Sequence, residues 1–161
     1  MSTSNYKSIA AKIKFEGRAF INGKYVDAID GKKFETMNPA TGEVLCSVAK
    51  CNNKDVNLAV EVSRKAFSSG VWSKTSPEFR KDILLKFAEL LREQGEENSV
   101  LECVDTGKLI GDCINEVAND APMHFQWYGE LIDKVFGKIG PTEPSLTSLI
   151  VKEPIGVVAG V

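Results

Sequence analysis

The last ten residues, 152–161, constrain the fold of this chain more than any other segment. They form an apolar run of Ile, Val, Ala and Gly that follows Pro154. A short apolar run bounded by a proline is typical of a strand buried on both faces of a parallel sheet. Such a strand needs neighbours, so we expect its partners to come from further sequence or from another molecule. We therefore expect the chain to be the front part of a larger protein.

Length and composition are those of an ordinary globular protein. The 161 residues suit about one domain, and 43% hydrophobic with 26% charged residues is usual for a soluble chain. A net charge of −2 gives no general field that attracts nucleic acid or anionic membranes. The sequence shows neither an apolar run long enough to span a bilayer nor the core of a secretory signal. We expect a cytoplasmic protein with no nucleic-acid or membrane partner.

The four cysteines lack the spacing of a zinc site. Cys46, Cys51, Cys103 and Cys113 form no Cys-x-x-Cys pair, and His124 is the single histidine of the sequence. This histidine falls within a predicted helix, where a packing or surface role is more common than catalysis. We expect scattered free thiols and no catalytic residue in this chain.

The front of the chain carries the signals of antiparallel hairpins. Asn22 and Gly23 lie between two short β-type runs and supply the positive φ angles of a type I′ turn. Residues 33–37 and 43–48 flank a loop that contains proline and glycine. We expect residues 1–18, ahead of these hairpins, to be a flexible leader.

About four helices follow, each with one apolar stripe. We expect the first to begin at Asn53 as its N-cap and to stop at Gly70. The second opens at Ser76-Pro77, where a missing N–H does no harm. A third covers about 96–104, and a long fourth covers about 112–135 and contains a proline at a kink or break. Each stripe needs a sheet or other helices beneath it, so this inventory of elements is incomplete.

Six short motifs occur in a recognisable order. They are Phe20-Ile21-Asn22-Gly23, Asn38-Pro39-Ala40-Thr41-Gly42-Glu43-Val44, the helix start from Trp72 to Arg80, Asp105-Thr106-Gly107-Lys108, Trp127-Tyr128, and Glu153-Pro154-Ile155-Gly156-Val157. With these motifs in this order, the chain from about Phe20 to Val161 resembles the N-terminal part of the NAD(P)-dependent aldehyde dehydrogenase family. Residues 127–135 look most similar to the branch that oxidises amino-aldehydes such as γ-glutamyl-aminobutyraldehyde.

The resemblance implies an α/β fold, the N-terminal portion of a Rossmann-like cofactor domain. This portion has antiparallel β-hairpins, about four helices and part of the β oligomerisation arm. After the leader, residues 19–136 would belong to the cofactor-binding domain, and residues 137–152 to the oligomerisation arm. Residues 153–161 would be the first strand that returns to the cofactor sheet. The resemblance also implies a homo-oligomer.

The resemblance further implies oxidation of an aldehyde, with an amino-aldehyde favoured, to the carboxylic acid with NAD or NADP. In the family, the nucleophilic Cys, the general-base Glu and the oxyanion-binding Asn come after the segment that this chain matches. We therefore expect the 161-residue chain alone to be inactive. Val161 would lie against the adenosine side of the cofactor, although core packing is the simpler explanation of one apolar residue.

Two further sites follow from the resemblance. Thr36, Met37 and Asp105 match positions that hold a structural K⁺ or Na⁺ in many relatives, through oxygen ligands that suit a hard cation. The alternative is a turn and an Asp at a helix end. Glu116 and Asp120 match a helix at the substrate entrance, where a carboxylate can hold a substrate ammonium. The alternative there is an ordinary solvated helix face.

Two other functions remain open on the sequence. The chain could be a naturally short, non-catalytic interaction protein or subunit decoy that acts through its β-arm. It could also be a stand-alone α+β binding domain, which the ordered motifs disfavour. Reading the gene beyond the codon for Val161 separates an enzyme's front part from a short protein.

Overall fold

The computed structural model describes residues 3–160, and the first of these form helix α1 (Thr3–Ala10). The leader is therefore helical over these residues, where the sequence predicted no regular element. The helix contacts α4 (Gly95–Thr106), and the Asn5 side chain donates a hydrogen bond of 2.9 Å to Glu96. A helix this short depends on tertiary contacts, and periodicity alone does not reveal them. The expected flexibility of the leader stays a prediction.

The predicted hairpins are confirmed. Strands β1 (Ala19–Ile21) and β2 (Lys24–Val26) pair antiparallel. Asn22 and Gly23 between them have φ angles of 54° and 73°, as a type I′ turn requires. Strands β3 (Lys33–Met37) and β4 (Val44–Ala49) form the second hairpin.

Helix α2 (Asn53–Ser69) begins one residue earlier than predicted, because its N-cap is Asn52 and not Asn53. The Asn52 side chain accepts a hydrogen bond from the backbone N–H of Lys54 at 2.8 Å. The buried Asp55 completes a capping box by accepting the Asn52 backbone N–H at 2.8 Å. Gly70 ends the helix in the left-handed conformation, as predicted.

Helix α3 (Pro77–Glu93) has the predicted Ser76 cap, whose hydroxyl accepts the Phe79 N–H at 3.1 Å. Helix α4 follows directly and ends at Gly107, which is left-handed with a φ of 76°. The predicted third helix, at about 96–104, is thus confirmed with one or two more residues at each end.

The predicted long helix is continuous but not uniform. It consists of α5 (Ile110–Cys113), the π-helix η1 (Ile114–Asp120), α6 (Ala121–Leu131) and the 3-10 turn η2 (Ile132–Lys134). The buried Pro122 stands in the first turn of α6, directly after the π-helix. The predicted irregularity at this proline is therefore a widened helical segment that precedes it.

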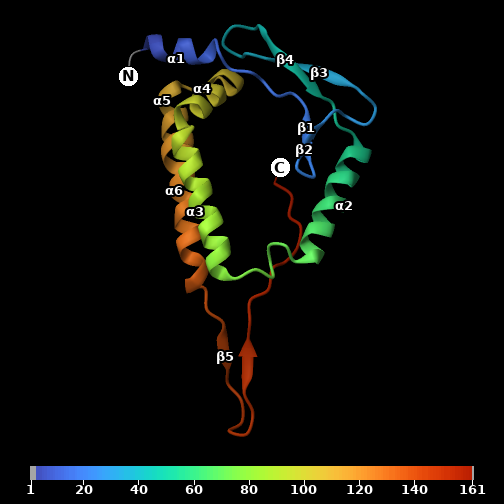
Figure 1. The fold of residues 1–161 in the computed structure, drawn as a ribbon, viewed down its shortest axis with the longest axis vertical. Helices are drawn as coiled ribbons and strands as arrows, with labels where there is room; N and C mark the ends of the chain where they lie inside the picture. The colour runs from blue at the N-terminus through green and yellow to red at the C-terminus, as the bar shows by residue number, and fades with distance from the viewer. Residues whose placement is uncertain (1–2, 161) are drawn as a thin grey trace.

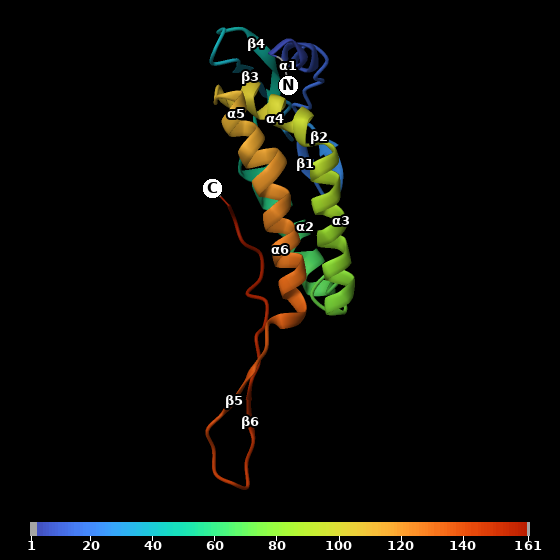
Figure 2. The ribbon, with the colours of Figure 1, turned by 90° about the vertical axis from the view of Figure 1, so that its left-hand side faces the viewer.

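The C-terminal part forms one long hairpin and then returns. Strands β5 (Lys138–Gly140) and β6 (Ser148–Ile150) pair antiparallel and extend away from the helices (Figures 1 and 2). Residues 151–160 form no strand, so the strand predicted for residues 153–161 is not seen in the described part of the chain. The physical reason is that a strand requires a partner ladder, and within residues 3–160 no ladder reaches this segment.

The arrangement is open rather than layered around one core. Figure 1 shows α3 and α6 together on one side, and α2 with the β1–β2 hairpin on the other. Phe87 of α3 meets Phe125 of α6 edge to face, with ring centroids 4.6 Å apart. Residues of the predicted apolar stripes stay accessible, for example Val56 at 56% and Phe79 at 49%. Among residues 3–160, none of the helices has the length and apolar character to cross a membrane.

Candidate functional site

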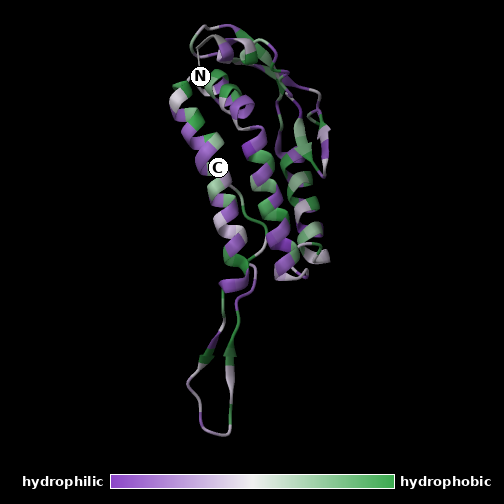
Figure 3. Cartoon of the chain, turned by 60° about the vertical axis from the view of Figure 1, so that its left-hand side comes forward, coloured by the Kyte–Doolittle hydropathy of each residue, from purple (hydrophilic) through white to green (hydrophobic). Residues whose placement is uncertain are grey.

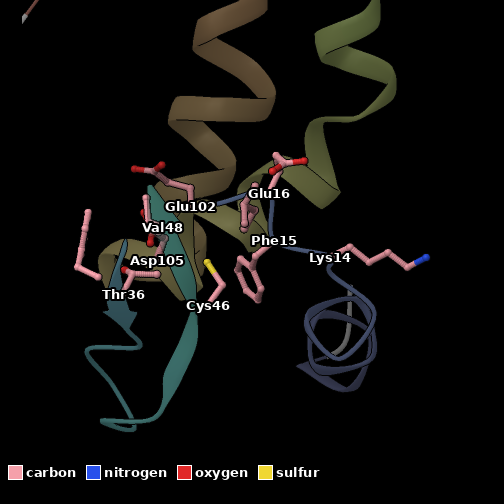
Figure 4. A pocket seen from close by; sticks show the side chains of 10 residues that line it. Lys14, Phe15, Glu16, Thr36, Cys46, Val48, Glu102 and Asp105 are labelled. Carbon is pink, nitrogen blue, oxygen red and sulfur yellow. The ribbon is translucent and has the colours of Figure 1, made fainter. Parts of the chain in front are cut away.

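A cleft of about 540 Å³ lies where the β3–β4 hairpin, α4 and the end of the leader meet (Figure 4). Three parts of the chain that are distant in sequence supply its walls. The lining residues are Lys14, Phe15, Glu16, Phe34, Thr36, Cys46, Val48, Leu101, Glu102 and Asp105. The cleft therefore combines apolar side chains with several oxygen-bearing ones.

The cleft brings together two of the three residues predicted to hold a monovalent cation. Thr36 of β3 and Asp105 of α4 both line it (Figure 4), whereas Met37 does not. A β-bulge separates Thr36 from Met37, because Thr36 pairs with Cys46 while Met37 pairs with Val44. A bulge disturbs the hydrogen-bond ladder and redirects backbone groups, which is a setting in which carbonyl oxygens become available.

Of the three carboxylates that line the cleft, Glu16 is paired with an arginine. Glu16 accepts hydrogen bonds from the Arg18 side chain at 2.8 and 2.6 Å, and these bonds lower the pKa of Glu16 from 4.5 to about 2. Within the part of the chain that the structure describes, no three His, Cys, Asp or Glu side chains are placed to share one metal ion. A cation in this cleft would therefore need backbone carbonyls besides the Asp105 carboxylate, which is the donor set of a hard monovalent ion.

The predicted substrate-entrance residues lie on the π-helix. Glu116 and Asp120 are both exposed residues of η1. Glu116 accepts a hydrogen bond from the ammonium of Lys108, with 2.6 Å between Nζ and Oε2. Lys108 also lies 3.6 Å from Oε1 of Glu102 on α4. Glu116 is thus an accessible carboxylate that already binds one ammonium group.

The remaining candidates differ in position: one lies outside the described residues, one is buried and one is exposed. Val161, the predicted cofactor contact, lies outside the described residues. Cys113 is buried, and burial raises the pKa of its thiol, which opposes formation of a thiolate. His124 is exposed on α6.

Sequence reasoning missed three features of these sites. Lys108 was noted only as part of a motif, and its pairing with Glu116 depends on how α4 and η1 pack. Gly17 packs against β4, where its carbonyl accepts the Ala49 N–H at 2.7 Å. The Glu16–Arg18 pair had a detectable signal, namely opposite charges two residues apart ahead of a strand.

Comparison with known proteins identifies relatives for nearly the whole chain. Residues 25–161 match the model of the aldehyde dehydrogenase family. The chain is 41% identical to the aminoacetaldehyde dehydrogenase of Pseudomonas aeruginosa, over 98% of the chain and 32% of that protein. It is 38% identical to the NADP/NAD-dependent aldehyde dehydrogenase PuuC of Escherichia coli, over 94% of the chain and 31% of that protein.

Solved structures agree with these matches. The γ-glutamyl-γ-aminobutyraldehyde dehydrogenase of Burkholderia cenocepacia is 41% identical, with a TM-score of 0.93 over 97% of this chain and 32% of its own. An indole-3-acetaldehyde dehydrogenase in complex with NAD⁺ is 36% identical, with a TM-score of 0.92 and the same coverage. The chain thus spans about a third of the length of the relatives that it matches.

Proposed function

Because the chain belongs to the aldehyde dehydrogenase family, we propose that the protein it is part of oxidises an aldehyde to the carboxylic acid with NAD or NADP. The observation that carries this proposal is a family match over residues 25–161 together with the fold of dehydrogenases over 97% of the chain. Formation of NADH or NADPH on addition of an aldehyde to the full-length protein is the test. Absence of cofactor reduction across aliphatic, aromatic and amino-aldehydes would refute it.

An amino-aldehyde is the proposed substrate class. Support comes from the relatives, which include an aminoacetaldehyde and a γ-glutamyl-γ-aminobutyraldehyde dehydrogenase, and from the accessible carboxylates of Glu116 and Asp120. A carboxylate binds an ammonium through a charge-assisted hydrogen bond. Replacing Glu116 by Gln should raise the KM for a cationic aldehyde and leave a neutral aldehyde of equal length unchanged. Glu89→Gln, on the exposed face of α3, is the matched control.

Residues 1–161 alone are proposed to be inactive. Aldehyde oxidation of this kind needs a thiolate nucleophile, oxyanion donors and a hydride acceptor at one point. The buried Cys113, whose thiol pKa is raised, is a poor nucleophile, and the resemblance puts the nucleophile beyond residue 161. Aldehyde turnover by the pure 161-residue chain with NAD⁺, lost on alkylation of its thiols, would contradict this.

The described residues do not by themselves fit the cofactor. Dinucleotides are usually held where a glycine-rich loop leads from a strand into a helix N-terminus, and within residues 3–160 no such loop is formed. NAD or NADP is therefore proposed for the full-length protein only. The support lies in relatives, one named as using NADP or NAD and one solved with NAD⁺. The role of Val161 beside the cofactor also stays a proposal.

A structural K⁺ or Na⁺ is proposed at Thr36, Met37 and Asp105. Two observations support it: Thr36 and Asp105 line the same cleft, and a β-bulge lies between Thr36 and Met37. In this proposal, K⁺ should raise the melting temperature of the full-length protein more than tetramethylammonium at equal ionic strength. Asp105→Asn should remove the difference, and Asp82→Asn on α3 should not.

A cytoplasmic homo-oligomer is the proposed assembly, with residues 137–152 as its arm. Figure 3 shows hydrophobic residues along both strands of this hairpin, and Ile139 and Leu149 are 75% and 68% exposed. Such strand edges recruit partners. The same arm also favours the alternative of a non-catalytic interaction protein or subunit decoy. Deleting residues 141–146 at the hairpin tip, followed by light scattering and activity assays, distinguishes an enzyme's arm from a decoy's.

A further inference from the structure

Lys108 is fixed at the junction of two helical segments. It follows the left-handed Gly107 at the end of α4, and its backbone carbonyl accepts a hydrogen bond of 3.1 Å from the Cys103 thiol. From this position the Lys108 side chain reaches η1, where its ammonium donates a hydrogen bond to Glu116.

One cation serves two carboxylates at this junction. The Lys108 ammonium is 2.6 Å from Glu116 and 3.6 Å from Glu102. The side chains of Lys108 and Glu116 remain 44% and 52% exposed, so a dissolved cation can reach the same oxygens. Within residues 3–160, Oε1 of Glu116 accepts no hydrogen bond. The junction thus keeps an unneutralised negative charge beside an ammonium that is already bound.

We propose that Lys108 competes with the substrate ammonium for Glu116 and thereby sets how strongly the site prefers cationic aldehydes. The inference rests on the proposed function, because it takes Glu116 as the ammonium contact. Lys108 is a specificity-determining residue in this view and takes no part in the chemical step. Its ammonium occupies Oε2, so an incoming ammonium must displace it or bind to Oε1 alone.

The test is an NMR titration at low ionic strength, which measures how tightly the full-length protein binds n-butylammonium. Lys108→Met should tighten binding about two- to fivefold, the range that one exposed ion pair produces. Lys86→Met is the matched control, since Lys86 pairs with Glu89 at 2.6 Å on the surface of α3 and should change nothing. Adding Glu116→Gln to Lys108→Met should abolish the gain.

Unchanged or weaker binding in Lys108→Met would overturn the inference, because Lys108 would then support the site rather than compete for it. Aldehyde kinetics separate this outcome from failure of the proposed function. Tighter n-butylammonium binding without any aldehyde turnover would refute the proposed function and leave the competition standing. In an active protein, Lys108→Met should lower the KM for the cationic aldehyde alone and leave kcat unchanged.

Discussion

Gly17 is the position where one added methyl group should have the largest local effect. A Cβ atom on Gly17 would stand 2.1 Å from the carbonyl oxygen of Ser47 and 3.3 Å from the Cα of Val48, both backbone atoms of β4. Ordinary contact begins at 3.4 Å, so Gly17→Ala requires a displacement of about 1.3 Å. Backbone atoms in a paired strand do not yield as a flexible side chain does. The leader must move instead.

That movement breaks a specific hydrogen bond. The N–H of the buried Ala49 donates to the Gly17 carbonyl at 2.7 Å, and a shift of about 1.3 Å takes the pair beyond hydrogen-bond range. A buried N–H without its acceptor costs about 1–3 kcal/mol. The Ala49 amide should therefore exchange with solvent about 5- to 150-fold faster.

Hydrogen exchange of the Ala49 amide, followed by NMR, measures this directly. Gly111→Ala is the control, because a Cβ on Gly111 meets no atom within 4 Å and its φ is not positive. The control should leave the Ala49 amide protected. Unchanged exchange of Ala49 in Gly17→Ala would refute the steric argument, since it would mean that the leader can retreat without losing the bond.

Two further predictions concern the caps and charges around the hairpins. Asp55→Ala should lower the free energy of unfolding, measured by urea denaturation, by about 2–4 kcal/mol. The reason is that Asp55 accepts hydrogen bonds from the backbone N–H groups of Ile29 and Asn52 at 2.9 and 2.8 Å. A loss below about 0.5 kcal/mol would contradict this. The pKa of Glu16, lowered from 4.5 to about 2 by Arg18, means that this ion pair stabilises the fold above pH 4.5 and that its contribution is lost as the pH falls toward 2. Carboxyl NMR should show that Arg18→Gln returns the Glu16 titration to its ordinary range.

Local chemistry explains which elements the sequence predicted. Asn22-Gly23, Gly70 and Ser76-Pro77 each act through their own backbone preferences or a neighbour within three residues, and all three appear where expected. The cap of α2 was misplaced by one residue because Asn52 and Asn53 are chemically identical. Only the position of Asp55, three residues after Asn52, distinguishes them.

Features that depend on distant parts of the chain were not predictable in the same way. The cleft needs Thr36 on β3 and Asp105 at the end of α4, and only the family resemblance connected them. Helix α1 exists through its contact with α4, which no periodicity within residues 3–10 encodes. The apolar stripe of α2 was predicted to need a sheet or other helices beneath it, beyond the predicted elements of this chain, and Val56 is indeed 56% exposed. Burial depends on what packs against a helix as well as on its own pattern.

The π-helix changes the meaning of the acidic spacing in the sequence. In an α-helix, Glu116 and Asp120 at four-residue spacing would share one face, and the N–H of Asp120 would bond back to Glu116. In η1 the Ala121 N–H donates to the Glu116 carbonyl instead, so the hydrogen bond spans five residues rather than four. Glu116 then finds its partner across the helix junction in Lys108, at 2.6 Å, rather than along its own helix. We therefore propose that a loop lysine controls the selectivity of this surface for cations, a role that the acidic spacing does not indicate when the segment is taken as an α-helix.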